Sequence, residues 1–242
     1  MKFCASILLM IMSTSAQAEG WSLAPRVGHQ NLKFHSKGTE YISYSTSAEN
    51  TGPIPLEYEY EKDDSASTAF FNSTVQGLRF MYAMESFNLV SDLDFSRYYS
   101  TGAKIDLLGL GLSAQVPVAQ MESFKVYGLI GFSLRSLKLR LYETSYSFGY
   151  ESIDYNGQAG GYPTINVGNY DVGLGASFPL SESMSLIAEY KYSDTIAKGT
   201  FEAKTKSNVS NETHSVSYES SSKSKNNTLT TQDLTLGLIF AL

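Results

Sequence analysis

The chain has 242 residues, with 18 Lys and Arg against 24 Asp and Glu and a formal net charge of -6. Its single Cys excludes a disulfide-rich module and a Cys-based zinc site, and because no basic block is present, nucleic acid is not an expected partner. No apolar run reaches the roughly 18 residues that a membrane helix needs. One large all-β unit fits this length.

The beginning of the chain has the order of features that marks a secretory signal peptide. Lys2 gives a short positive start, residues 7–12 are apolar, and Ala16-Gln17-Ala18 is a small-residue cleavage site. We therefore predict that residues 1–18 are a signal peptide removed on export and that residues 19–242 form one β-barrel domain.

Eight segments of the exported part are predicted to be strands, because apolar and polar residues alternate in them with a period of two. In the segment 87–95, for example, Phe87, Leu89, Leu93 and Phe95 share one face and the polar side chains share the other. In chain order the eight segments are about 21–33, 74–84, 87–95, 104–117, 124–135, 169–178, 184–193 and 233–242.

One of these segments departs from simple alternation near its end. Residues 124–135 keep their apolar side chains at even positions, but after Arg135 the apolar positions become Leu137, Leu139 and Leu141. This switch indicates either a β-bulge or a strand that leaves the bilayer.

The connections between the segments alternate in length. Short turns at one end and long loops at the other are characteristic of an outer-membrane barrel, and hydrocarbon requires the sheet to close. The predicted fold is therefore all-β, an eight-stranded antiparallel transmembrane β-barrel with short periplasmic turns and long extracellular loops. The short connections are Glu85-Ser86, 118–123 and Pro179–Ser183, and the long ones are 35–70, 136–163 and 196–230.

The two faces of the strands indicate lipid outside and a polar interior. A soluble β-sandwich would also alternate, but its apolar rows would point inward. Here the apolar rows end in aromatic residues, as interfacial girdles require, and the opposite rows mix Gly with charged residues. The residues assigned to the girdles are Phe87, Phe124, Phe178 and Phe240 beside the short turns, and Phe95, Tyr98, Tyr99, Tyr170 and Tyr192 near the long loops.

The lengths of two predicted turns fix which residues of their strands face each other, and this register predicts ion pairs inside the barrel. A two-residue turn at Glu85-Ser86 places Arg79 opposite Asp92, and a five-residue turn at Pro179–Ser183 places Asp171 opposite Lys191. We hypothesise a lumenal network in which each buried charge is paired; the alternative is a chance arrangement on polar strand faces. The lumenal ion-pair residues are Arg79, Asp92, Asp94, Asp171, Glu189 and Lys191.

Three segments carry a resemblance to a known family. Residues 127–132, Tyr-Gly-Leu-Ile-Gly-Phe, resemble a fifth strand, residues 169–178 with 186–192 resemble the sixth and seventh strands, and residues 235–242 resemble the terminal strand of the OmpX/Ail and OmpA-like small outer-membrane barrels. The resemblance implies a bacterial outer-membrane location and recognition by the barrel-assembly machinery. The implied assembly signal consists of Thr235, Gly237, Phe240 and Leu242.

No catalytic, cofactor or metal pattern stands out, since three dispersed His offer no ligand spacing. We expect a non-enzymatic scaffold that displays loops for adhesion or for host or envelope interaction. The expected partners are outer-membrane lipid and lipopolysaccharide, the assembly machinery and a host surface ligand. Alternatives are a narrow ion-conducting channel and, less favoured, a lipid-modifying enzyme.

The second long loop is the candidate binding surface, because Tyr combines contact area with a polar tip. The alternative role of its tyrosines is to pack an extended hairpin. The residues concerned are Tyr142, Tyr146, Tyr150, Tyr155 and Tyr162.

Overall fold

A computed structural model describes residues 20–45, 57–100, 103–121, 123–150, 153–161, 164–210 and 215–242. Among these residues no helix is long and apolar enough to cross a membrane. The strands are β1 (Trp21–Ser45), β2 (Glu57–Ala83), β3 (Asn88–Ser100), β4 (Ala103–Gln120), β5 (Lys125–Tyr150), β6 (Ile153–Gly161), β7 (Thr164–Pro179), β8 (Met184–Ala197), β9 (Gly199–Ser210) and β10 (Ser215–Ala241).

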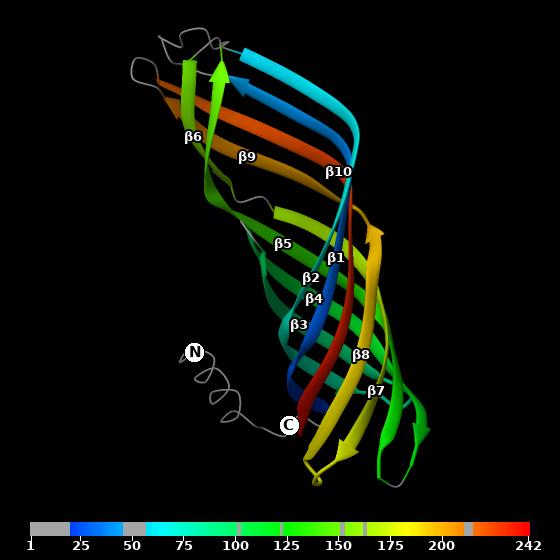
Figure 1. Cartoon of the computed structure of the whole chain (residues 1–242). Helices are drawn as coiled ribbons and strands as arrows, with labels where there is room; N and C mark the ends of the chain where they lie inside the picture. The colour runs from blue at the N-terminus through cyan, green and yellow to red at the C-terminus, as the bar shows by residue number, and fades with distance from the viewer. Residues whose placement is uncertain are drawn as a thin grey trace.

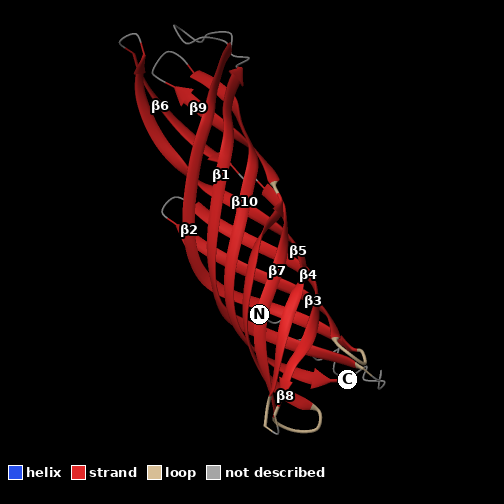
Figure 2. Ribbon diagram, turned by 90° about the vertical axis from the view of Figure 1, so that its right-hand side faces the viewer, coloured by secondary structure: helices blue, strands red, loops and turns tan. Residues whose placement is uncertain are grey.

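Eight of the strands close into a barrel, which confirms the predicted fold. The ring runs β1, β2, β3, β4, β5, β7, β8 and β10, every neighbour is antiparallel, and β10 pairs back to β1. The strands are tilted against the long axis (Figures 1 and 2). Closure pairs the backbone within the ring, as lipid surroundings demand.

Much of the sequence predicted as long loops continues the barrel strands as β-ribbons. The β1–β2 pairing runs from Trp21 opposite Tyr82 to Ser45 opposite Glu57, and β6 and β9 lie wholly beyond the ring. Beyond the barrel, β2, β1, β10, β9, β6 and β5 pair in this order into one sheet (Figure 1). Tyr and Thr favour strands even where both faces are polar, so low hydrophobicity alone did not distinguish ribbon from loop.

The outer surface of the barrel carries the apolar rows. Ile130, Phe132 and Leu134 are each more than 60% exposed, whereas the alternating Ser133 and Arg135 are buried. Rings gather at both borders of this belt. The centroid distances are 5.0 Å for Trp21–Tyr82 and 5.7 Å for Phe124–Phe178 at the short-turn end, and 6.4 Å for Tyr170–Tyr192 at the other.

Tyr98 does not belong to the outer girdle to which the sequence pattern assigned it. It is 1% exposed and lies in the barrel interior. The reason is parity: the outward residues of β3, among them Leu93 and Phe95, are at odd positions, so an even position faces inward.

The parity switch after Arg135 is not a bulge. Pairing of β5 with β7 is continuous from Lys125 to Lys138, and pairing with β4 is continuous past Leu137 to Leu141. Leu137 is 3% exposed and points into the interior. The strand therefore keeps its alternation, and it is the interior that becomes apolar near the long-hairpin end.

Candidate functional site

The interior of the barrel consists of three layers stacked along the strands. An apolar cluster near the short turns contains Met81, Val90 and Ile187, and a charged layer follows. The third layer, toward the long hairpins, is apolar and is built from Leu32, Tyr98, Ile105, Leu107, Leu137, Ile165, Val167 and Leu229.

Arg79 on β2 lies at the centre of the charged layer and is fully buried. The register is the one that a Glu85-Ser86 turn predicts, with Arg79 directly opposite Asp92 of β3. Its Nε donates to Asp92 Oδ1 at 2.8 Å and its Nη2 donates to Asp92 Oδ2 at 3.1 Å. Its Nη1 donates to Glu189 of β8 across the lumen, so one guanidinium joins two carboxylates.

Arg26 on β1 is a second central cation, which the sequence analysis missed. Its Nη2 lies 2.6 Å from Asp94 Oδ1 and 3.1 Å from Asp92 Oδ1, and its Nη1 lies 3.2 Å from Glu189 Oε2. Tyr127 donates its hydroxyl to Glu189 at 2.8 Å. Glu189 is thus held by two arginines and a tyrosine.

The predicted pairing of Asp171 with Lys191 is wrong. The β7–β8 turn spans residues 180–184, one residue later than predicted, and its Leu180 and Ser181 amides donate to the Met184 carbonyl. Because a one-residue shift of the turn moves the register by two, each side chain keeps its face but changes its partner. Asp171 lies opposite Ser193 and Lys191 lies opposite Gly173.

Both residues nevertheless belong to the charged layer. Lys191 Nζ lies 3.0 Å from Asp94 Oδ2 and 3.5 Å from Asp92 Oδ2. Asp171 accepts a hydrogen bond from Ser133 at 3.0 Å and lies 4.0 Å from Arg135 Nη2. The lumenal charges are therefore joined across the barrel, rather than only within hairpins.

The upper part of the charged layer contains further partners, of which Arg135 and Gln30 were not singled out in the sequence analysis. Arg135 donates to Ser193 at 2.9 Å and lies 3.7 Å from Asp233. Gln30 donates to Asp233 at 2.7 Å and accepts from Tyr98, which links the charged layer to the apolar one above it. In the part of the chain that the structure describes, the buried charges are four basic and five acidic: Arg26, Arg79, Arg135 and Lys191, and Asp92, Asp94, Asp171, Glu189 and Asp233.

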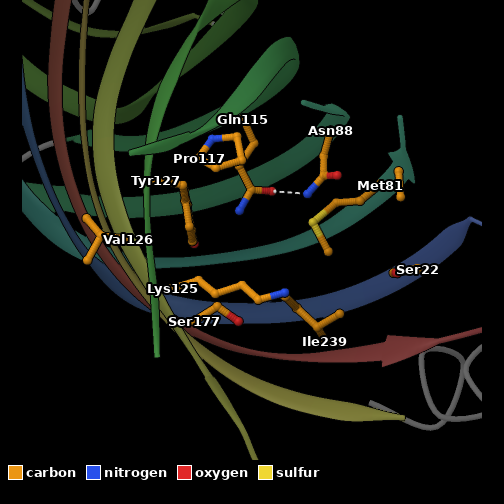
Figure 3. Close-up of a pocket in the computed structure, with 11 residues that line it drawn as sticks. Ser22, Met81, Asn88, Gln115, Pro117, Lys125, Val126, Tyr127, Ser177 and Ile239 are labelled. Carbon is orange, nitrogen blue, oxygen red and sulfur yellow. Dashed lines mark hydrogen bonds between the residues drawn. The ribbon is translucent and has the colours of Figure 1, made fainter. Parts of the chain in front are cut away.

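A vestibule opens into the barrel interior at the short-turn end (Figure 3). This cavity has a volume of about 200 Å³, and Lys125, Tyr127, Met81 and Ile239 are among its lining residues. Asn88 donates to Gln115 at 3.2 Å across one wall. Since Tyr127 also binds Glu189, the vestibule ends at the charged layer.

The remaining predicted residues lie on two other parts of the chain. Thr235 and Gly237 of β10 face the lumen, opposite Glu189 and Ile187, and the Leu242 amide donates to the Trp21 carbonyl; Phe240 lies opposite Met184. Their role in assembly stays a prediction. Tyr142, Tyr146 and Tyr150 lie on β5 and Tyr155 on β6, whereas their side chains and Tyr162 lie outside the described residues.

A closed antiparallel barrel with an apolar belt, two aromatic borders and a charged, filled interior defines an integral outer-membrane barrel protein. The chain belongs to the family described as outer membrane protein beta-barrel domain, which matches residues 3–238. The protein is accordingly located in the bacterial outer membrane, with its short turns on the periplasmic side and its ribbons outside.

Solved structures of similar fold include Neisserial surface protein A, with 14% identity, coverage of 89% of this chain and 99% of that chain, and a TM-score of 0.45. OprG from Pseudomonas aeruginosa has 13% identity, 92% and 97% coverage and a TM-score of 0.42. The attachment invasion locus protein Ail of Yersinia pestis has 14% identity, 88% and 99% coverage and a TM-score of 0.34. No curated protein matches the sequence.

Proposed function

We propose that this protein is a closed outer-membrane scaffold whose function resides in its extracellular sheet, which presents a surface for adhesion or for host or envelope interaction. The observation that carries the proposal is the continuation of β1, β2, β5 and β10 beyond the barrel, where they pair with β6 and β9 into one sheet (Figure 1). Loops and ribbons of this kind carry function when a rigid barrel positions them. The proposal assigns no catalytic residue.

The filled interior supports a scaffold over the alternative of a narrow ion channel. Arg79, Asp92 and Glu189 are each at most 4% exposed, and Arg79 binds both carboxylates. The apolar layer around Leu137 and Ile165 lies between them and the outside. A hydrated ion would have to displace both layers, and an eight-stranded barrel is only wide enough for its own side chains.

The β5–β6 ribbon is the part of the extracellular sheet that we assign to ligand contact. Tyr146 lies opposite Gly157 and Phe148 lies opposite Tyr155 in its register. Aromatic residues give contact area at low entropic cost, and they are enriched at binding hot spots. The predicted alternative, packing of the hairpin itself, would leave this ribbon without a role in binding.

The proposal is tested with bacteria that display the full chain or a variant in which Tyr142, Tyr146, Tyr150 and Tyr155 are all replaced by Ser. Adherence to cultured epithelial monolayers is expected to fall at least fivefold in the variant. The matched control replaces Tyr41, Tyr44, Tyr58 and Tyr60 of the β1–β2 ribbon by Ser and keeps wild-type adherence. Heat-modifiable gel migration verifies that each barrel is folded, and equal adherence of all three strains would refute the assignment.

A further inference from the structure

Basic side chains gather on one side of the barrel, directly above the apolar belt. On β3, β4 and β5 the outward row changes from apolar to charged at the same level. The last apolar residues of the outward rows are Phe95, Leu108 and Leu134. Beyond them lie the charged residues Arg97, Asp106 and Lys138, which face one another across the three strands. We call the outward residues Arg97, Lys104, Lys138 and Arg140 the basic patch. With Asp106 in its centre, the patch carries four positive charges against one negative charge.

Asp106 organises this patch. It lies opposite Arg97 on one side and Lys138 on the other, while Lys104 lies opposite Arg140. The Nε atoms of Arg97 and Arg140 lie 2.6 Å and 3.7 Å from Asp106, and both arginine side chains remain more than 40% exposed. The carboxylate therefore fixes both guanidinium groups through Nε, and a large part of each stays accessible to a ligand.

An apolar groove lies on the outer wall immediately below the patch. It has a volume of about 380 Å³, and its lining is mainly apolar, with Leu108, Leu110, Leu134 and Ala197. Ser136, Asn166 and Lys198 also line it. Gly168 contributes no side chain to the groove, and a Cβ there would lie 3.2 Å from that of Ala197. An apolar slot with cations along one border suits a ligand with an acyl chain and an anionic head.

Among the described residues, the outward rows of β1 and β8 near the same level carry fewer basic side chains than the patch. At the long-hairpin end of β8 the outward charge is Asp194, which accepts a hydrogen bond from Thr230. On β1 the exposed lysines are Lys33, which lies over the Phe70 ring at 5.8 Å from its centroid, and Lys37. The patch and the groove are therefore a local feature of the β3–β8 wall, rather than part of a uniform ring of charge.

We propose that the basic patch and the groove form a binding site for one lipid A molecule, the phosphorylated and acylated anchor of lipopolysaccharide. The site lies at the ribbon end of the belt, hence in the outer leaflet, which lipopolysaccharide occupies. One acyl chain lies in the groove, and a phosphate binds Lys138, Arg140 and Arg97, since guanidinium and ammonium groups bind phosphate through charge-assisted hydrogen bonds. This inference is independent of the proposed role of the extracellular sheet.

Native mass spectrometry of the detergent-solubilised full barrel tests the site. The probes are lipid A with two phosphates, the same lipid without phosphate, and phosphatidylglycerol. The patch variant combines Arg97→Gln, Lys138→Gln and Arg140→Gln, the groove variant is Ala197→Phe, and the matched control is Lys33→Gln. Heat-modifiable migration verifies that each variant is folded.

The expected result is one retained lipid A on the wild type and on Lys33→Gln, with retention at least fivefold lower on the patch variant and on the groove variant. Dephosphorylated lipid A and phosphatidylglycerol are expected to be retained at least fivefold less by the wild type. Equal retention by the patch variant and the wild type would overturn the proposal. Equal retention of phosphatidylglycerol would overturn it too, because the patch would then attract any anionic lipid.

Discussion

Replacing Arg79 by Leu is expected to destabilise the barrel by about 3 kcal/mol. Removal of one partner from a buried ion pair costs about 3–5 kcal/mol, because the other charge stays buried. Arg79 binds both Asp92 and Glu189. Each of these carboxylates keeps a contact with Arg26, at 3.1 Å and 3.2 Å, which places the expected loss at the lower end of that range.

The free energy of unfolding is measured by guanidinium titration of the barrel reconstituted in lipid vesicles, followed by tryptophan fluorescence. The chain has one Trp, Trp21, whose ring lies 5.0 Å from that of Tyr82 at the periplasmic border, so its emission reports loss of the barrel. The control is Lys33→Leu, an exposed outward change that is expected to stay within about 0.5 kcal/mol.

A double-mutant cycle separates the ion pair from the burial of charge. Asp92→Leu alone also leaves partners unpaired, but Arg79→Leu with Asp92→Leu removes both charges, so the double variant should lose less stability than the sum of the single variants. The expected coupling is about 1–3 kcal/mol, as for residues in one network. A loss below about 1 kcal/mol for Arg79→Leu, or additive single effects, would refute the account of the lumen given above.

Three further predictions concern the interior and the end of the chain. Wild-type barrels in planar bilayers should give no reproducible conductance steps, because a hydrated ion would have to displace the charged layer and the apolar layer of the lumen. Salt-dependent steps that disappear with Arg79→Ala would instead establish the channel. Gly175→Val should cost about 1–3 kcal/mol in the same guanidinium titration, since a Cβ at 175 would lie 2.5 Å from the Tyr127 ring, whereas Gly128→Ala meets nothing closer than 3.8 Å and should be neutral. Phe240→Ala should lower the heat-modifiable fraction in the outer membrane during assembly, and an unchanged fraction would contradict a role in the assembly signal.

Much of the barrel could be predicted because the two faces of its wall have such different surroundings. Lipid outside and charge inside impose a period of two on every spanning strand, which is why the outward positions of Ile130, Phe132 and Leu134 are readable from the sequence. The two-residue turn at Glu85-Ser86 also fixes its register without ambiguity. The pairing of Arg79 with Asp92 follows from that turn alone.

The remaining features depend on information that alternation does not contain. A shift of two residues preserves the face of every side chain, so the β7–β8 register could not be recovered from hydrophobicity. Apolar and polar residues alternate only weakly in the first strand, so the pattern did not assign Arg26 to the lumenal face. The apolar interior around Leu137 reverses the usual rule for a barrel lumen.

Size complementarity supplies the missing rule for register. Several large charged side chains of the lumen lie opposite a glycine on one neighbouring strand: Lys191 faces Gly173 and Glu189 faces Gly175 on β7. On a neighbouring strand a charge can also face an opposite charge, as Lys191 faces Asp233 and Arg79 faces Asp92. The space left by the glycine lets a charge extend across the axis to further strands, as Lys191 does to Asp94. The same relation recurs on β4, where Gly109 and Gly111 lie opposite Asp94 and Asp92. Glycine spacing on one strand and charge spacing on the next therefore select among registers that hydrophobic alternation treats as equal.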